Sequence, residues 1–482
     1  MNFFVNKGMG HGNSGVEHAQ FYRAERFREK KIPFKLVFTD LLPKLHLHMQ
    51  EWHLAENEVI GMYDYFLADN PDDYLENGLR EISEFQEEML WDLTNTQRRQ
   101  VRQTTGSYTE TILRDKRYSE KKKIYIVDDS RVFLENGIHR LSWHYRDYGS
   151  RGKLATNIHL DNFRGQSYFF ETFEELVSFF FAELQGSYDH NIFIIDRGNE
   201  NEEILVRLKD GGVPLKIVDV VHAAHLVEFQ NGHPLFNNFY QYMFDHFNSM
   251  DAVITATKLQ RDAMKKDLAQ LEAPEQLKKI RAIPVGGAEI NEPARHWDGT
   301  EARFVTASRL HPEKHISQII KAVDQLRKAG MNATLAIFGS GGDEKALKEL
   351  IEKLDLGKYV TLKGLSQDVV HDLQSYDVFV SASYSEGFGL TYIEAISDSL
   401  PIATYSNLFG AQELVHEGRN GALADFSRQD SDEEANVKNL AAAMKRTIEN
   451  YDELSQGAHQ VAQQYQPHII ADQWAELMEE LS

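Results

Sequence analysis

The chain has 482 residues, 42% of them hydrophobic, and a net charge of −22. This length suits two or three domains with sizeable cores. The charge argues against nucleic-acid binding and a globally basic membrane-binding face, and the lack of cysteine excludes disulfides and thiolate zinc sites. The first residues hold too short an apolar run for a signal peptide, and no run reaches membrane-spanning length. We therefore expect a cytoplasmic protein with at most peripheral contact at the inner face of the cell membrane.

The N-terminus has the pattern of a β-α-β unit. Residues 2–6 and 34–40 predict strands, with a glycine-rich turn and a helix over 16–29 between them. Gly10-x-Gly12-x-x-Gly15 matches the dinucleotide fingerprint, and Asp40 stands where a ribose-binding acid would lie. The alternative interpretation is a turn that places backbone amides beside a diphosphate or an acceptor.

An antiparallel β-meander is expected inside this first α/β unit. Short apolar runs with hairpin turns at Glu135-Asn136-Gly137 and Asp147-Tyr148-Gly149 are typical of such a sheet. The predicted strands are 109–113, 123–127, 131–134, 138–145 and 155–160. The segment also carries local basic groups that could steer an anionic polymer or bind an acidic partner surface: Arg98, Arg99, Arg102, Lys116, Arg117, Lys121, Lys122 and Lys123.

The α/β pattern then returns with strands at 191–196, 215–221, 252–256 and 280–285, followed by a linker to Thr300. The second of these strands ends in His222-Ala223-Ala224-His225. Two histidines at this spacing could suggest a metal, but the HExxH pattern is absent and no third ligand stands out. Two other interpretations remain. One of the histidines serves a site at the carboxyl end of the strand, or it is a core histidine whose hydrogen bonds are made inside the protein.

A second doubly wound unit follows. Its strands are expected at 304–307, 334–338, 360–363, 378–383 and 402–405, and helices fill 433–482. Arg309 and Lys314 follow the first strand, where they could clamp phosphate charge or form an exposed basic loop. The turn Gly339-Ser340-Gly341-Gly342 could cradle a phosphate or serve only as a tight turn.

The stretch 385–395 predicts a glycine-punctuated turn between a buried strand and a helix. Gly387 and Gly389 would let the backbone approach a ligand, and the helix N-terminus suits a phosphate. Glu386 lies in the turn and Glu394 about one turn into the helix, and eight helical residues rise roughly 12 Å. One carboxylate could therefore bind a ribose while the other faces a sugar, although two glutamates at a helix start can also be solvated residues.

The ordered set of motifs resembles the retaining, nucleotide-sugar-dependent glycosyltransferases of family four. It consists of Ala307-Ser308-Arg309-Leu310 with Glu313-Lys314, the 339–342 turn, and Glu386 with Glu394. The start Gly12-Asn13-Ser14-Gly15-Val16-Glu17-His18-Ala19 and the inserted meander resemble a bacterial subgroup of that family. This subgroup includes poly(glycerol-phosphate) α-glucosyltransferases of teichoic acid and O-GlcNAc transferases of serine-rich adhesins. The stretch 407–413 departs from the pattern by holding fewer glycines and prolines.

The resemblance implies an α/β protein of the GT-B fold, with two Rossmann-like domains facing a cleft. The implied organisation is an N-terminal domain in two parts, 1–62 and 187–288, around an inserted β-meander domain at 63–186. A C-terminal nucleotide-sugar domain at 289–465 follows, and a helix at 466–482 crosses back to the N-terminal domain.

The resemblance also implies roles for individual residues. Arg309 and Lys314 would neutralise the diphosphate, Glu394 would bind the ribose, and Glu386 would hold the donor sugar. His222 would meet the sugar from the opposite domain. Backbone contacts to phosphate, sugar and base are implied for Gly15, Phe388, Gly389, Leu390, Gly364 and Leu365.

The implied activity is a metal-independent, cofactor-free, retaining transfer of glucose or N-acetylglucosamine from a UDP-sugar to a bacterial cell-surface acceptor. Teichoic acid poly(glycerol phosphate) is the acceptor expected first, and Ser or Thr of a serine-rich surface protein is the alternative. The insertion is expected to bind the acceptor or a partner in a homo- or hetero-oligomer. A dinucleotide-dependent oxidoreductase would leave Arg309, Lys314 and the two glutamates unexplained, and a catalytically silent scaffold subunit would leave the intact donor set unexplained.

Overall fold

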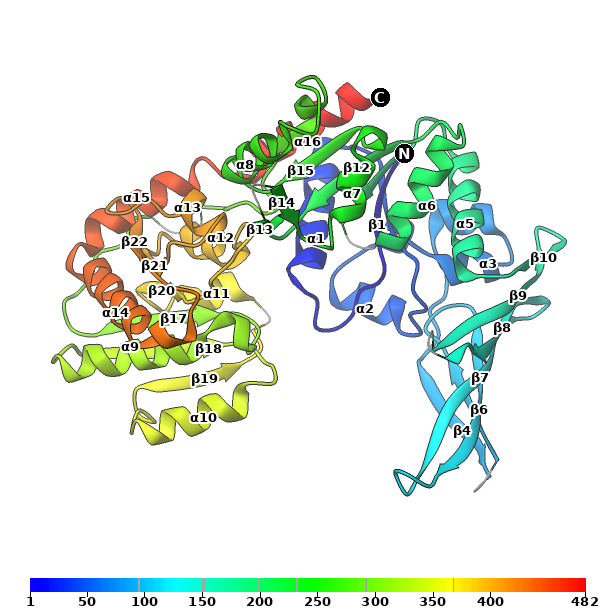
Figure 1. The fold of residues 1–482 in the computed structure, drawn as a ribbon, viewed down its shortest axis with the longest axis horizontal. Helices are drawn as coiled ribbons and strands as arrows, with labels where there is room; N and C mark the ends of the chain where they lie inside the picture. Colours follow the sequence, from blue (N-terminus) through cyan, green and yellow to red (C-terminus); the bar gives the residue numbers. More distant parts are fainter. Residues whose placement is uncertain (94–95, 150–151, 197–198, 231–232, 291–292, 367) are drawn as a thin grey trace.

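The computed structural model describes residues 1–482 apart from 94–95, 150–151, 197–198, 231–232, 291–292 and 367. The chain folds into two α/β domains with parallel sheets, and an antiparallel sheet is inserted into the first (Figure 1). This confirms the predicted fold class. In Figure 1 the inserted sheet projects at the lower right, away from the C-terminal domain on the left. Over the described ranges, no helix combines the length and apolar character needed to cross a membrane.

The N-terminal domain has a parallel sheet with the strand order β16-β15-β12-β11-β1-β2-β3. Its strands read as near-continuous apolar runs because helices cover both faces. On one face, for example, the Phe4 ring meets Phe27 of the first helix edge-on at 4.9 Å. The strands are β1 (Asn2–Asn6), β2 (Phe34–Phe38), β3 (Val59–Gly61), β11 (Ile192–Ile195), β12 (Lys216–Val221), β15 (Ala252–Thr255) and β16 (Ile280–Ala282).

The first helix of this domain, α1 (Gly15–Lys30), begins where its sequence directs. The Ser14 hydroxyl accepts from the amide of Val16, and the Glu17 carboxylate accepts from the Ser14 amide at 2.7 Å, which completes a capping box. The other helices of the domain and its flanks are α2 (Leu45–Glu51), α3 (Met62–Leu67), α4 (Pro71–Asn77), α5 (Phe173–Ser187), α6 (Asn199–Asp210), α7 (Gln241–Asp245) and α8 (Lys258–Leu268). A hairpin of β13 (Leu226–Gln230) and β14 (His233–Phe236) follows β12.

The inserted sheet has the sequential antiparallel order of a meander, from β4 to β10. Trp143 and Phe163 are buried on its inner face, whereas Phe169 is exposed. The predicted strands at 123–127 and 131–134 form one long strand, and the first two strands of the sheet were not predicted. The strands are β4 (Gln86–Asp92), β5 (Gln97–Gln103), β6 (Thr109–Ser119), β7 (Ile124–Asn136), β8 (His139–Asp147), β9 (Lys153–Phe163) and β10 (Gln166–Phe170).

The C-terminal domain repeats the doubly wound plan with the strand order β19-β18-β17-β20-β21-β22. Its strands are β17 (Ala302–Ala307), β18 (Ala333–Phe338), β19 (Val360–Gly364), β20 (Val378–Ser381), β21 (Ile402–Tyr405) and β22 (Gly421–Ala424). Its helices are α9 (Ile316–Lys328), α10 (Glu344–Lys353), α11 (Val369–Leu373), α12 (Leu390–Ser397), α13 (Gly410–Leu414), α14 (Glu433–Glu449) and α15 (Tyr451–Ala462).

The last helix, α16 (Pro467–Leu481), lies against α1 of the N-terminal domain. The rings of Phe27 and Trp474 are 5.9 Å apart, and Lys30 pairs with Asp472 at 2.5 Å. The C-terminus of the chain therefore ties the two domains together (Figure 1).

Candidate active site

The two parallel sheets meet at the carboxyl ends of their strands, where open α/β sheets place their sites. Gly387, in the turn before α12, packs against the end of β12, so that a Cβ there would lie 2.2 Å from the carbonyl oxygen of His222. A Cβ on Gly286 would lie 2.5 Å from Leu390. The absence of side chains at these two glycines therefore lets the α12 turn come close to the N-terminal domain.

Lys314 and Glu386 form an ion pair at this junction. Lys314 ends a short 3-10 turn after β17, and its Nζ lies 2.5 Å from Oε1 of Glu386, with each side chain 20% exposed. The backbone of Glu386 is held by the amides of Phe409 and Gly410, which donate to its carbonyl at 2.7 and 2.9 Å. The structure thus brings together the cation predicted for the diphosphate and the carboxylate predicted for the sugar.

Arg309 lies apart from this pair. Its guanidinium is 63% exposed and pairs with Glu313 at 2.7 Å. Its neighbour Leu310 donates its amide to Ser340 at 2.9 Å, so the loop is tied to the predicted phosphate-cradling turn. A Cβ on Gly341 would lie 2.3 Å from the carbonyl oxygen of Leu310, so close backbone approach explains this glycine.

Gly364 and Leu365, predicted to contact the base of the nucleotide, lie at the carboxyl end of β19, beside the 339–342 turn. The amide of Gly339 donates to the carbonyl of Gly364 at 2.7 Å, which joins the ends of β18 and β19. Leu365 follows and is 52% exposed, so its side chain is free to pack on a flat ring.

The N-terminus of α12 supplies the predicted backbone donors. Gly389 caps the helix with φ 89°, a conformation that favours glycine. The first turn of a helix leaves amide N–H groups without intrahelical acceptors and carries the positive end of the dipole. The Phe388 side chain is buried, so this residue can serve a ligand only through its backbone. Phe388 and Gly389 therefore offer a ligand only their backbone amides.

Glu394 reaches the opposite domain from within α12. Tyr22 of α1 donates its hydroxyl to Oε1 at 3.3 Å, while Oε2 is closed off from solvent and has no partner in the described part of the chain. Gly15, at the start of α1, lies opposite Leu390, because a Cβ on it would be 3.9 Å from that side chain.

Burial raises the pKa of Glu394 from 4.5 to about 7, and this predicts a pH dependence of stability. Because the folded-state pKa lies above the unfolded one, the stabilisation is present below pH 4.5 and is lost as pH rises through about 7. Glu394→Gln removes this titration. Between pH 5 and pH 8 the variant should gain about 2.5 kcal/mol in unfolding free energy relative to the wild type. Urea unfolding at both pH values measures the difference, and parallel pH profiles would contradict the assignment.

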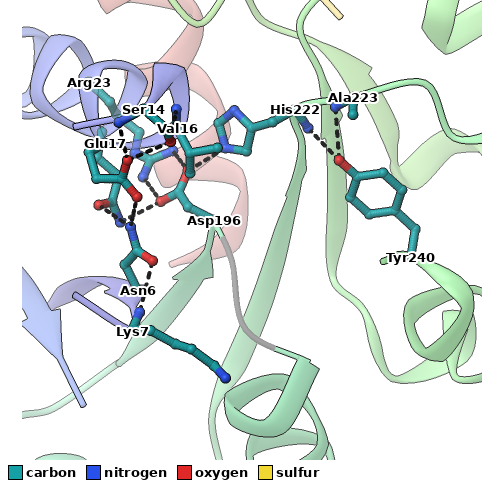
Figure 2. Close-up of polar contacts among 11 residues, drawn as sticks. Asn6, Lys7, Ser14, Val16, Glu17, Arg23, Asp196, His222, Ala223 and Tyr240 are labelled. Atoms are coloured by element: carbon teal, nitrogen blue, oxygen red, sulfur yellow. Dashed lines mark hydrogen bonds and ion pairs between the residues drawn. The ribbon is translucent and has the colours of Figure 1, made fainter. Parts of the chain in front are cut away.

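A buried polar network holds His222 (Figure 2). Asp196, at the end of β11, accepts from Nη1 of Arg23 at 3.1 Å and from Gln20 at 2.8 Å, and its Oδ1 lies 2.9 Å from Nε2 of His222. Burial works to raise the pKa of Asp196, but Arg23 and His222 outweigh it and hold that pKa below its usual range. The contact fixes the imidazole ring and leaves Nδ1 as the nitrogen that can face a ligand.

Tyr240 completes this network from the other side. Its hydroxyl accepts from the amides of His222 and Ala223 at 3.0 and 2.8 Å (Figure 2). By contrast, His225 is buried, its Nε2 lies 3.0 Å from Asp267, and its ring stacks on Phe409 at 5.7 Å. Of the two histidines, His222 is therefore the candidate for the site, and His225 is a buried packing residue.

Sequence reasoning did not identify Tyr22, Asp196, Tyr240 or Glu413 as site residues. Asp196 had a detectable signal, because it is an acidic residue at the carboxyl end of a parallel strand. Glu413 lies in the divergent 407–413 stretch and accepts from the amides of Lys258 and Leu259, both at 3.1 Å. The divergent stretch therefore caps α8 of the opposite domain.

Comparison with known proteins defines the class. Residues 288–461 match the family described as glycosyl transferases group 1, and with this fold and site they make the chain a glycosyltransferase. Over its whole length the chain resembles one kind more specifically. It is 28% identical to the UDP-N-acetylglucosamine–peptide N-acetylglucosaminyltransferase GtfA subunit of Limosilactobacillus reuteri subsp. suis, over 99% of this chain and 98% of the relative.

Two further matches define the neighbourhood. The poly(glycerol-phosphate) alpha-glucosyltransferase of Bacillus subtilis is 29% identical over 49% of this chain and 34% of its own length. The crystal structure of the pneumococcal O-GlcNAc transferase GtfA in complex with UDP and GlcNAc matches with a TM-score of 0.73 and 24% identity, over 100% of this chain and 98% of that chain. The predicted resemblance to both groups is thereby confirmed.

Proposed function

We propose that the chain transfers N-acetylglucosamine from UDP-N-acetylglucosamine to serine or threonine hydroxyls of a polypeptide. The proposal rests on the share of the chain that each relative matches. The peptide transferase subunit matches over 99% of the chain, whereas the poly(glycerol-phosphate) enzyme matches 49%. A full-length match includes the inserted sheet, which the donor site does not need. The protein acceptor, the alternative in our sequence reading, therefore replaces poly(glycerol phosphate) as first choice.

The charges of the inserted sheet support this choice. The basic groups that favoured a polyanionic acceptor are mostly neutralised within the sheet. Lys116 lies 2.5 Å from Asp92, and Arg102 lies 2.7 Å from Glu87. Further pairs are Arg98–Asp92, Arg117–Asp128 and Lys123–Glu120. Paired cations offer little net charge to a phosphate polymer.

The surface beside His222 also suits a polypeptide. The β13–β14 hairpin and the loop after it are tied to this strand end, since Asn237 donates its amide to His225 at 2.8 Å and its side chain to Ala224. On this segment Val227 is 61% exposed and Phe239 is 70% exposed. Exposed apolar and aromatic side chains suit a neutral peptide better than a chain of phosphates.

The site residues fit a retaining transfer driven by charge stabilisation. Lys314 and the N-terminus of α12 would neutralise the diphosphate as the bond to the sugar breaks. Glu394 would hold the ribose, Glu386 the sugar hydroxyls, and Nδ1 of His222 would contact the sugar from the other domain. Lys314 and the N-terminus of α12 supply positive charge at the diphosphate, which supports a reaction without metal.

We infer that the protein is cytoplasmic and works as part of an assembly. The relative from Limosilactobacillus reuteri is itself described as a subunit. The inserted sheet offers a surface for a protein partner. Its edge strand β4 is almost fully exposed, with Met89 at 44%, Leu90 at 42% and, just beyond the strand, Leu93 at 53%. Unprotected edge strands with apolar side chains are uncommon in isolated proteins, because they invite pairing with another chain.

A transfer assay in the presence of EDTA tests the acceptor, the donor and the metal independence together. Released UDP and labelled product are measured with UDP-N-acetylglucosamine or UDP-glucose, on a serine-rich polypeptide or on poly(glycerol phosphate). We expect the polypeptide and UDP-N-acetylglucosamine to give the higher kcat/KM, by at least about tenfold for the acceptor. Faster transfer to poly(glycerol phosphate) would make that polymer the acceptor instead. Loss of activity in EDTA that magnesium reverses would refute metal independence.

A further inference from the structure

A second candidate site lies on the N-terminal domain, and of the residues that line it only Lys258 was given a contact above, through its backbone amide. A cavity of about 490 Å³ opens between α8 and α16, over the edge strand β16. The two helices lie beside one another in the upper part of Figure 1. Besides its charged groups, described next, the cavity is lined by Ile280, Ala282, Ile283, Gln473 and Leu477.

The cavity concentrates positive charge in a strongly acidic chain. Five cations line it, against the carboxylates of Glu476 and Glu480. Arg281 pairs with Glu480 at 2.7 Å, Arg261 with Asp262 at 2.8 Å, and Lys278 with Glu275 at 2.6 Å. Lys258 and Lys265 have no ion pair among the described residues. Their charges are therefore available to a ligand.

The groups in the cavity are also incompletely satisfied. Burial and the neighbouring charges of Arg261 and Arg281 lower the pKa of Lys265, so the cations repel one another as they stand. In addition, Oε1 of Gln473 is closed off from solvent and has no partner in the described part of the chain. A bound anion would relieve the repulsion, and the Gln473 amide could turn its N–H toward it.

We propose that this cavity binds a phosphate-bearing anion. Guanidinium groups match phosphate oxygens in fork geometry, and lysines add point charges, so Arg261 and Arg281 with Lys258 and Lys265 suit this ligand class. The cavity also has apolar walls. Beside it, Leu259 on α8 and Leu271 just beyond the end of α8 are exposed. A phosphate next to an apolar surface fits either a soluble phosphate compound or the headgroup of an anionic lipid.

The double variant Lys258→Ala/Lys265→Ala tests the proposal, because these lysines make no ion pair that the fold would lose. Calorimetry measures the binding of inorganic tripolyphosphate, and sedimentation measures binding to phosphatidylglycerol vesicles against phosphatidylcholine vesicles. We expect the wild type to bind at least one probe in a salt-dependent manner. The double variant should bind that probe at least about tenfold more weakly. Saturable tripolyphosphate binding alone would identify a soluble ligand, and selective vesicle binding would identify a lipid headgroup.

The matched control is Lys345→Ala/Lys358→Ala, which removes two exposed lysines from the C-terminal domain. It should bind the probes like the wild type. The proposal is overturned if neither probe binds, if the cavity variant keeps wild-type affinity, or if the control loses as much as the cavity variant.

Discussion

Replacing Lys314 with alanine should lower kcat for sugar transfer by about a hundredfold to a thousandfold, the usual effect of losing one preorganised group that stabilises developing charge. Lys314 is the cation held beside the turn of Glu386 and the N-terminus of α12. Its removal also leaves the Glu386 carboxylate without its counter-ion. The loss should appear in single-turnover rates measured at saturating UDP-sugar.

Arg309→Ala is the matched comparison. The sequence assigns Arg309 and Lys314 the same duty, but Arg309 is 63% exposed and pairs with Glu313. A side chain this exposed contributes less to the stabilisation of buried charge, so we expect a smaller loss of kcat. Wild-type turnover of Lys314→Ala would refute its diphosphate role, and equal losses in the two variants would mean that Arg309 swings inward when substrate binds.

The fold was predictable where burial leaves a simple pattern. The central strands of both α/β domains are apolar runs, so residues 2–6 and 402–405 were predicted with the bounds that β1 and β21 have. β4 escaped prediction because an exposed edge strand has no apolar alternation. β22 escaped because its four residues, Gly421–Ala424, include one glycine and two alanines, which have low strand propensity.

The site was predictable in its local parts only. The turn that holds Glu386 and the helix that holds Glu394 follow from glycine spacing and helical periodicity over a few residues. The contacts that organise these side chains join distant segments: Lys314 meets Glu386 across 72 residues, and Tyr22 meets Glu394 across 372. The first pair depends on how two loops of the C-terminal domain are placed, and the second on how the two domains are placed against each other, and no local pattern encodes either placement.

Asp196→Ala should reduce the free energy of unfolding by about 3–5 kcal/mol, the cost of leaving a buried charge without its partner. The Arg23 side chain is 3% exposed, lies 4.3 Å from the ring centre of Phe4, and has Asp196 as its carboxylate partner. Water cannot replace that partner. Urea unfolding followed by far-UV circular dichroism measures the loss, and Asp73→Ala, which breaks the exposed pair with Arg80, should leave the unfolding curve nearly unchanged.

Two further variants test separately the buried charges of Arg23 and Asp196 and the role of Asp196 in positioning His222. Arg23→Met/Asp196→Leu removes both charges, so it should be more stable than Asp196→Ala although it has one more substitution. Asp196→Asn keeps the volume of the side chain but replaces the carboxylate that fixes the His222 ring. In protein that is still folded, it should lower kcat while the affinity for UDP is largely retained, because the side chains assigned to UDP, Lys314 and Glu394, lie in the opposite domain. If Asp196→Asn keeps wild-type kcat, the network does not hold His222 for catalysis. If Asp196→Ala unfolds like the wild type, Arg23 is satisfied by other groups.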